Sequence, residues 1–370
     1  MNEPAGIDQH VSRVLLLSKY DNMAASVRQR FMLYVPLLRE HGIELHISPL
    51  FDDDYLKRRF TTGGVNLGSV LRCYYRRLKA FLTSGRFDLA IIHYDAMPYF
   101  PAMIETLLMR SNIKYVYDFD DAAFHQYDES RNPIVRFFLS NKIAKVIKSA
   151  ACVFAGSEYL AEYAKRTNDS VVVVPTVVDT DRFPLKRHVQ SDRALVLGWI
   201  GSPSSTAYLT GIFPTIEKLT QIRPVKVIVI GATPFDVSEC DVEFREWSEE
   251  TEISDLLECD IGIMPLSDVP WARGKCAFKL IQYMACGLPV VASPVGANAG
   301  VVGKDAGFLA STPEEWLQAF TALADDAQMR ERMGRVGRQI VERQFSLRAT
   351  GPVVLKSLQR LIQNKETQHD

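Results

Sequence analysis

Short apolar runs alternate with helical patterns along the chain, and this alternation limits the fold more than any other feature. Sequences such as VVVV and VIVI are apolar on successive residues, which is typical of strands that helices cover on both faces. Helical patterns lie between the runs, for example over Val27–Glu40 and Pro313–Leu323. This order predicts βαβ units and parallel sheets, an α/β fold class. The expected strands are Val14–Leu17, Leu45–Ser48, Leu89–His93, Tyr115–Phe119, Val153–Ala155, Val171–Val174, Leu195–Ile200, Lys226–Ile230, Ile261–Pro265 and Pro289–Ala292.

The chain length predicts two domains, because 370 residues exceed what one core usually covers. A polar, charged stretch over Pro175–Arg193 separates the two sets of strands. We expect two doubly wound, Rossmann-like domains facing a central cleft, residues 1–185 and 190–350. Residues 351–370 read as a C-terminal helix and tail that could pack back onto domain one. In such sheets, ligands bind beyond the carboxyl ends of the strands.

The composition indicates which kinds of binding partner and which cellular compartment to expect. The formal net charge of −1 does not favour a nucleic-acid partner. The six cysteines form no CxxC pair, so they predict a reduced, cytoplasmic protein. The polar N-terminus predicts no signal peptide, and no apolar run reaches the roughly 18 residues of a membrane span. Any membrane contact would be peripheral, at the inner face.

The segment Ile261–Gly296 carries the most chemical information. It reads as strand, loop, helix, turn and strand, with the helix from about Cys276 to Cys286. A helix start offers unpaired N–H groups to a phosphate, and Arg273, Lys275 and Lys279 add positive charge there. The amide of Gln282 could contact ribose hydroxyls. The alternative is a surface helix with solvated lysines.

This segment resembles the donor-binding segment of retaining glycosyltransferase family 4. The similar phrases are FKLIQYMACGLPVVASPVG, LLECDIGIMPL and PTVVDTDRF, and the phrase GKCxFKxxQYMA marks one branch of the family. The resemblance implies the two-domain GT-B fold and hexosyl or related glycosyl transfer from a nucleotide-diphosphate sugar. It also implies retention of the anomeric configuration, no metal, no cofactor, and no nucleophile on the enzyme. A sugar or lipid-linked acceptor, in polysaccharide or glycoconjugate biosynthesis, fits the family.

The sequence departs from the family where two glutamates usually stand, eight positions apart. Here Gly274 and Gln282 occupy those places, and the loop GWIGSPSSTAYL lacks the family's cation. We infer that Lys275 and Lys279 supply the positive charge, which makes them catalytic candidates. The loop Gly201–Ser205 could be a phosphate contact or a plain turn. The donor-binding candidates are Gly201, Ser202, Gly231, Arg273, Gly274, Lys275, Cys276, Ala277, Phe278, Lys279 and Gln282.

Three carboxylates, Asp118, Asp120 and Asp121, lie at the carboxyl end of the strand Tyr115–Phe119 in domain one, within the sequence YVYDFDDA. Asp120 and Asp121 are catalytic candidates that could accept a proton or bind sugar hydroxyls; the alternative is a helix N-cap. Asp118-Phe-Asp120 is also formally a DxD, a weak metal–nucleotide signal. The acceptor-binding candidates are Arg28, Arg30, His93 and Asp118. Solvated arginines explain Arg28 and Arg30 equally well, and a lone histidine such as His93 is more often structural than catalytic.

A basic stretch over residues 65–79 has apolar residues at helical spacing. From Lys57 to Lys79 there are seven basic residues and no acidic one. Such a helix could lie on an anionic membrane, or its apolar stripe could belong to the core.

Two other readings stay open. One is a nucleotide-sugar epimerase or phosphorylase with the same fold. The other is a non-catalytic nucleotide-sugar-binding subunit that has lost activity with the glutamate at position 274. The sequence leaves the base, the sugar, the acceptor and the oligomeric state undetermined.

Overall fold

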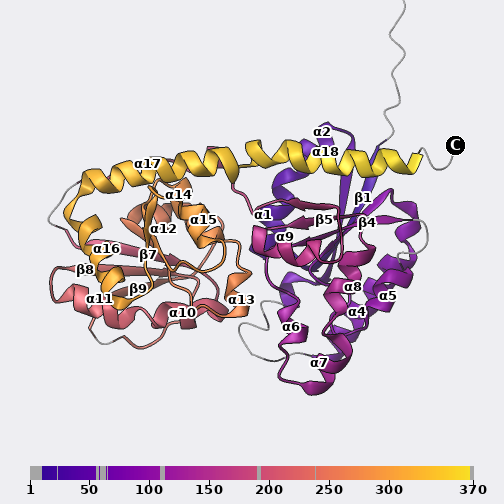
Figure 1. Ribbon diagram of the computed structural model, residues 1–370, viewed down its shortest axis with the longest axis horizontal. Coiled ribbons are helices and arrows are strands. Elements are labelled where there is room, and N and C mark those ends of the chain that lie inside the picture. Colours follow the sequence, from indigo (N-terminus) through magenta and orange to yellow (C-terminus); the bar gives the residue numbers. More distant parts are fainter. Residues whose placement is uncertain are drawn as a thin grey trace, which may run out of the picture. The chain divides into compact units, whose positions relative to one another are not determined.

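The protein, described here from a computed structural model, forms two compact units (Figure 1). Residues 11–22, 24–55, 58, 64, 66–108, 113–189, 193–237 and 239–366 are described. Unit 1 comprises Met1–Thr176 and Thr350–Asp370, and unit 2 comprises Val177–Ala349. The division falls before the predicted boundary, because Val178 already bonds to unit 2: its N–H donates to the Phe345 carbonyl at 3.0 Å. Residue 190, the predicted start of domain two, lies outside the described residues.

Unit 1 contains a six-stranded sheet in the order β2-β1-β3-β4-β5-β6, in which every pairing is parallel. The expected strand Leu45–Ser48 is longer in the structure, because it pairs with β1 along its whole length. The strands are β1 (Ser12–Tyr20), β2 (Ile43–Phe51), β3 (Leu89–His93), β4 (Lys114–Phe119), β5 (Cys152–Ala155) and β6 (Val171–Val173).

The single helix predicted over Val27–Glu40 is wrong. The structure has two short helices, with a 3-10 turn at Met32–Tyr34 between them and Pro36 in the first turn of the second. Proline lacks an N–H and restricts the residue before it, so it starts a helix better than it continues one. Among the described residues before Thr176, the helices of unit 1 are α1 (Ala25–Arg30), α2 (Val35–Glu40), α4 (Leu67–Leu82), α5 (Ala102–Leu108), α6 (His125–Asp128), α7 (Pro133–Leu139), α8 (Lys142–Ser149) and α9 (Glu158–Lys165).

Unit 2 contains a second parallel six-stranded sheet, in the order β12-β11-β10-β7-β8-β9. Strands β9 and β12 are missing from the expected set; both are edge strands of the sheet, and neither has a run of successive apolar residues as long as those of the expected strands. The strands are β7 (Leu195–Ile200), β8 (Val225–Ile230), β9 (Asp241–Arg245), β10 (Ile261–Met264), β11 (Val290–Ala292) and β12 (Gly307–Leu309).

Helices cover both faces of the unit 2 sheet (Figure 1). One buried cluster includes Leu280, Tyr283 and Met284 of α14, and the other includes Trp199 and residues of α11 and α16. The expected helix Pro313–Leu323 extends to Asp325. The helices are α10 (Thr206–Thr210), α11 (Phe213–Thr220), α12 (Glu252–Glu258), α13 (Pro270–Arg273), α14 (Phe278–Ala285), α15 (Asn298–Val302), α16 (Pro313–Asp325) and α17 (Ala327–Gln344).

The last helix, α18 (Leu347–Glu366), brings the end of the chain onto unit 1. Its Thr350 hydroxyl lies 2.8 Å from the Tyr34 hydroxyl, and Val354, Leu358 and Ile362 are buried. No helix among the described residues is long and apolar enough to cross a membrane. The two units therefore have separate parallel sheets, and unit 1 is built from both ends of the chain.

Candidate functional site

The strand order of unit 2 reverses between β7 and β10, which makes their carboxyl ends the place where such a sheet binds ligands. Gly201 follows β7 directly, and its N–H donates to the Ile230 carbonyl at 2.9 Å. Ser202 comes before a 3-10 turn, Pro203–Ser205, that leads into α10. Helix α14 follows the loop after β10. The predicted donor-binding residues at Gly201, Ser202 and in α14 thus lie on elements that meet at this edge.

Lys279 of α14 reaches the loop after β7. Its Nζ atom lies 4.0 Å from the centre of the Trp199 ring and donates to the Ser205 hydroxyl at 3.3 Å. A Cβ added to Gly201 would overlap Lys279 Nζ, the Trp199 ring and Ser205 Oγ. The glycine therefore leaves the space that the ammonium group occupies.

The environment of Lys279 disfavours its charge. Burial lowers the pKa of Lys279 well below the ordinary lysine value, and the nearby Lys275 lowers this pKa further. The side chain is half-buried. An anion that binds beside Lys279 stabilises the charged form of this lysine. The attraction between the two charges offsets the cost of desolvation and the repulsion by Lys275.

Tyr283 fixes α14 against the sheet. Its hydroxyl donates to the Ile263 carbonyl at 3.2 Å and accepts from the Ile200 N–H at 3.0 Å, so it bridges β10 and β7. Gly262 makes room for the ring, since a Cβ there would overlap Tyr283. One side chain thus sets the position of α14 at the switch point.

The loop before α14 has an unusual backbone conformation at Ala277. This residue has φ 57° and is buried, so the helix begins at Phe278 and not at Cys276 as predicted. Left-handed backbone at a residue other than glycine costs roughly 1–2 kcal/mol. Strain of this kind often marks a ligand-binding segment.

The other predicted donor-binding residues of this loop differ in exposure. Arg273 is exposed and forms an ion pair with Asp268, with Nε 2.6 Å from the carboxylate. Lys275 and Phe278 are half-buried, whereas Gly274 and Cys276 are buried. The Asp268 carboxylate therefore competes with any anion for Arg273, and Lys279 is the better-placed cation.

Gln282 is buried and bonds to a carboxylate within the unit. Its Nε2 donates to Glu252 at 3.4 Å, and the Trp247 indole N–H donates to the same oxygen at 2.8 Å. Gly231, at φ 82°, lies between Trp247 and Gly201: a Cβ there would overlap the Gly201 carbonyl and lie 3.1 Å from Trp247 Cβ. Gly201, Gly231 and Gln282 are thus brought together.

In unit 1, Asp120 and Asp121 follow β4 and are half-buried. Asp120 accepts hydrogen bonds from the Tyr94 hydroxyl and, at 3.3 Å, from the Thr176 hydroxyl. Tyr94 has φ 64°, another left-handed residue. The alternative that an aspartate caps the next helix is wrong, because the N-cap of α6 is Phe124 and no side chain caps it.

Arg30, His93 and Asp118 form a buried cluster. The Arg30 guanidinium donates to both carboxylate oxygens of Asp118 and to the Val174 carbonyl, and His93 Nδ1 lies 2.7 Å from Asp118. Burial alone would raise the pKa of Asp118, but the charge and hydrogen bonds of Arg30 and His93 lower this pKa. These three predicted acceptor-binding residues are at most 4% exposed. Arg28 instead donates to the Asn22 carbonyl at 2.6 Å.

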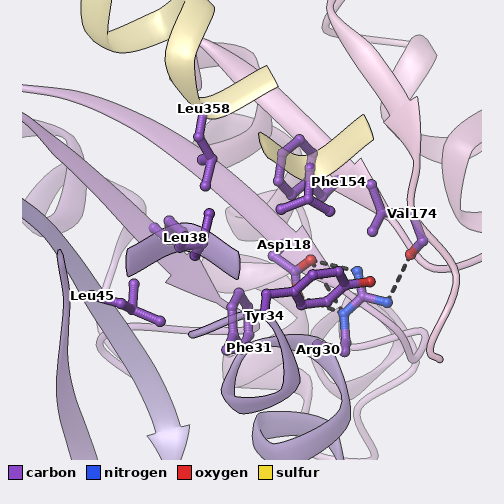
Figure 2. Close-up of a pocket in the computed structure, with 11 residues that line it drawn as sticks. Arg30, Phe31, Tyr34, Leu38, Leu45, Asp118, Phe154, Val174 and Leu358 are labelled. Atoms are coloured by element: carbon purple, nitrogen blue, oxygen red, sulfur yellow. Dashed lines mark hydrogen bonds and ion pairs between the residues drawn. The ribbon is translucent and has the colours of Figure 1, made fainter. Parts of the chain in front are cut away.

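A small pocket beside this cluster is mainly apolar (Figure 2). Tyr34, Leu38 and Phe154 line it together with Leu358 of α18, and the Arg30–Asp118 pair lies at one side. All the lining residues belong to unit 1. The pocket is therefore part of the packing between α18 and the sheet. No group of three His, Cys, Asp or Glu residues that could hold a metal ion occurs in the described ranges.

Helix α4 carries the basic stretch predicted over residues 65–79, of which Val65 lies outside the described residues. Its buried residues are Cys73, Arg77 and Phe81, so the core accounts for only one face. A second apolar stripe faces outward, at Leu67, Leu71, Tyr75, Leu78 and Leu82.

Three residues that position the candidate site were not singled out in the sequence. Trp199 and Ser205 contact Lys279. Glu252 accepts hydrogen bonds from Trp247 and Gln282. Trp199 is completely buried within a predicted strand and reads there as an ordinary core residue. The one signal that could have found it is its position two residues before Gly201. Glu252 offered no signal, because an acidic residue in the first turn of a helix is common.

Comparisons with known proteins found one matching family model and several solved structures of similar fold. Residues 194–326 match the family described as glycosyl transferases group 1. Among solved structures, sucrose-phosphate synthase from Thermosynechococcus elongatus is 13% identical over 95% of this chain and 100% of its own, with a TM-score of 0.70. HepE from Anabaena, in complex with UDP and glucose, is 15% identical over 95% and 100%, with a TM-score of 0.66.

WaaG, a glycosyltransferase involved in lipopolysaccharide biosynthesis, is 12% identical over 93% and 98% of the two chains, with a TM-score of 0.63. Identities this low show the fold alone, the two-domain α/β fold known as GT-B. No curated protein matches the sequence. The matched domain and the GT-B fold together support an enzyme of glycosyl transfer.

Proposed function

We propose that the protein transfers a glycosyl group from a nucleotide-diphosphate sugar to an acceptor, with retention and without a metal, as a member of glycosyltransferase family 4. The observation that carries the proposal is the placement of Lys279. It lies beside Gly201, at the switch point of the sheet, inside the domain that matches glycosyl transferases group 1. Such a half-buried cation suits the diphosphate of a donor.

In this proposal Lys279 and Lys275 stabilise the leaving group. When the bond to the sugar breaks, negative charge grows on the diphosphate, and cations fixed beforehand stabilise that charge without reorganising. Trp199 and Ser205 hold the Lys279 ammonium group in place. The N-terminal N–H groups of α14 add to the same effect. Gly231, Trp247 and Gln282 would form the nucleoside side of the site.

Unit 1 would supply the acceptor site. Asp120 and Asp121 are the predicted groups at the carboxyl end of β4, and Tyr94 and Thr176 orient Asp120. The buried pair of Arg30 and Asp118 would keep β4 and α1 in register beneath them. A sugar hydroxyl bonded to a carboxylate is a common form of carbohydrate recognition, because the carboxylate is a strong acceptor.

The acceptor would be a sugar or a lipid-linked sugar used in polysaccharide or glycoconjugate biosynthesis. The outward stripe of α4, with Leu71 and Tyr75 more than 60% exposed, supports contact with a membrane surface. Arg72, Arg76 and Lys79 lie on the same helix and would attract anionic lipid.

The first test is thermal stabilisation by a panel of nucleoside diphosphates, starting with UDP, with Mg²⁺ and with a chelator. Ligand at 100 times its dissociation constant should add roughly 2.7 kcal/mol of stability. The Lys279→Met variant keeps the apolar stem and removes the charge, so it should lose this shift. Lys304→Ala, at an exposed lysine of the same unit, is the control and should keep it.

Product analysis then separates the remaining readings. Transfer to an acceptor, or slow donor hydrolysis that Lys279→Met abolishes, supports the transferase; NMR of the product reports the anomeric configuration. Diphosphate binding without any turnover would favour a binding subunit. No stabilisation by any diphosphate would refute the proposed role of Lys279.

A further inference from the structure

The turn after β3, residues 94–100, contains two tyrosines with left-handed backbone. Tyr94 and Tyr99 both have φ 64°. A bulky residue adopts this conformation rarely, and only where the surrounding structure enforces it. The Tyr94 hydroxyl donates to Asp120, whereas the Tyr99 side chain is 59% exposed. Because the fold gains little from a ring that it leaves in water, the strain at Tyr99 points to a ligand for this ring.

Buried charges hold the turn from below. Lys142 of α8 donates to the Asp95 carboxylate at 2.7 Å and to the Met97 carbonyl at 2.5 Å, and Glu105 of α5 accepts from the Met97 N–H at 2.9 Å. The three charged residues are at most 5% exposed. Burial alone would raise the pKa of Asp95, but the charge and hydrogen bonds of Lys142 and Tyr127 lower this pKa. Because buried charges tolerate only a narrow geometry of their partners, they fix the course of the turn.

Two further tyrosines fix the backbone at Tyr99 itself. The Tyr127 hydroxyl of α6 donates to the Asp95 carboxylate and accepts from the Tyr99 N–H at 3.2 Å. The rings of Tyr99 and Tyr127 meet edge to face, with centroids 5.9 Å apart. From α4, the Tyr74 hydroxyl donates to the Pro98 carbonyl at 2.9 Å. The Tyr99 ring is therefore presented in place before a ligand arrives, which reduces the ordering cost of binding.

The turn lies at the edge of the sheet that carries the candidate carboxylate of unit 1. Strands β3 and β4 are parallel neighbours, with His93 opposite Asp118. The turn after β3 and Asp120 after β4 therefore leave the sheet at the same carboxyl edge, and the hydrogen bond from Tyr94 joins them. A pyranose offers hydroxyls, which a carboxylate binds, and faces of C–H groups, which an aromatic ring covers. An exposed ring beside a carboxylate matches both.

We propose that the Tyr99 ring stacks on a sugar ring of the acceptor. This inference rests on the proposed function, which places the acceptor in unit 1, and it adds a residue that recognises the acceptor through its apolar face. The ligand class is a pyranose with an uninterrupted face of C–H groups, since axial hydroxyls on that face would hold the two rings apart. Asp120 would accept hydrogen bonds from the sugar hydroxyls.

The test follows the Tyr99 ring by fluorine NMR in the full-length protein labelled with fluorotyrosine, and Tyr99→Phe assigns the resonance. The probes are the methyl pyranosides of glucose, galactose, mannose and rhamnose, titrated with and without UDP. At least one probe should shift the Tyr99 signal until it saturates. Ligand-observed NMR should then show that Tyr99→Leu weakens this probe at least about fivefold, because the aromatic face is gone. Tyr99→Phe keeps the face and should bind like the wild type.

The control is Tyr75→Leu, which makes the same change at a 69% exposed tyrosine of α4 and should leave affinity unchanged. Three results would overturn the proposal: no probe shifts the Tyr99 signal, Tyr99→Leu binds the probe as tightly as the wild type, or the signal shifts with protein concentration alone, which would place a second copy of the chain on the ring. A failure of the proposed function appears separately, as no stabilisation by any nucleoside diphosphate, because the titrations without UDP do not need the donor site.

Discussion

The half-buried Lys279 ammonium group lies between an aromatic face and a hydroxyl. The face of the Trp199 indole carries negative potential, so it partly compensates for the lost hydration of the cation. Ser205 supplies one hydrogen bond. A lysine restrained in this way is oriented before the ligand arrives, which reduces the ordering cost of binding.

Replacing Trp199 tests this restraint. We expect Trp199→Phe to weaken nucleoside diphosphate binding by about threefold to tenfold, because a smaller ring gives a weaker cation–π interaction. The measurement is the dissociation constant by calorimetry. Trp316→Phe makes the same chemical change at another buried tryptophan of unit 2 and should leave affinity unchanged. Equal losses in both variants would mean that only packing matters.

The lowered pKa of Lys279 predicts a pH dependence of stability. Between this lowered pKa and the ordinary value of 10.5, the unfolded chain binds the proton and the folded chain does not. Stability contributed by this group therefore rises as pH rises through that window. Urea unfolding of the wild type and Lys279→Met should show the wild type gaining stability relative to the variant with increasing pH. A constant difference would contradict the burial of the charge.

At the scale of elements, α14 is placed by close packing at glycines. Gly262 in β10 lies directly under the Tyr283 ring, and Tyr283 joins β7 to β10 through its hydroxyl. Only glycine fits at position 262, because any Cβ there would push the Tyr283 ring away. The distance from Lys279 to Gly201 then follows from how closely α14 sits on the sheet.

Gly262→Ala should destabilise unit 2 by about 1–3 kcal/mol, the usual cost of overpacking a core, and should weaken diphosphate binding as α14 moves. Thermal unfolding and calorimetry measure the two effects. Gly300→Ala, in α15, meets nothing within 4 Å, so it should leave stability unchanged or raise it slightly. If Gly262→Ala binds diphosphate like the wild type, the position of α14 does not control the site.

At the scale of the whole molecule, the chain leaves unit 1 at Thr176 and returns to it at Thr350. Unit 1 is therefore complete only when α18 packs on it, through the Tyr34–Thr350 hydrogen bond and the buried Leu358. A cavity made by truncating a side chain of α18 should destabilise the sheet of unit 1, although the helix is far away in sequence.

Leu358→Ala should cost about 2–5 kcal/mol and should speed amide hydrogen exchange in β1 to β6 while unit 2 keeps its protection. Leu323→Ala, at a completely buried leucine of α16, should do the reverse. Hydrogen exchange followed by mass spectrometry assigns each effect to a unit. Equal loss of protection in both units would show that the two unfold as one.

The sequence by itself determined the parallel sheets, the two-part organisation and the segment around Lys275 and Lys279. These features depend on local patterns: apolar runs of strand length, a polar joining segment, and glycine and proline at turns. Pro36 is a local signal of a helix start, which the prediction of one helix overlooked. Periodicity did not detect β9 and β12, because these edge strands are defined by their pairing with β8 and β11.

Only the tertiary structure decided which candidates meet. Lys279, Trp199 and Ser205 come from a helix, a strand and a turn that the sheet order brings together. Arg30, His93 and Asp118 were candidates for acceptor contacts in the sequence, yet Arg30 and Asp118 form an ion pair inside unit 1 and His93 lies within hydrogen-bond distance of Asp118. Burial and pairing depend on residues distant in sequence, so composition and spacing could not reveal them.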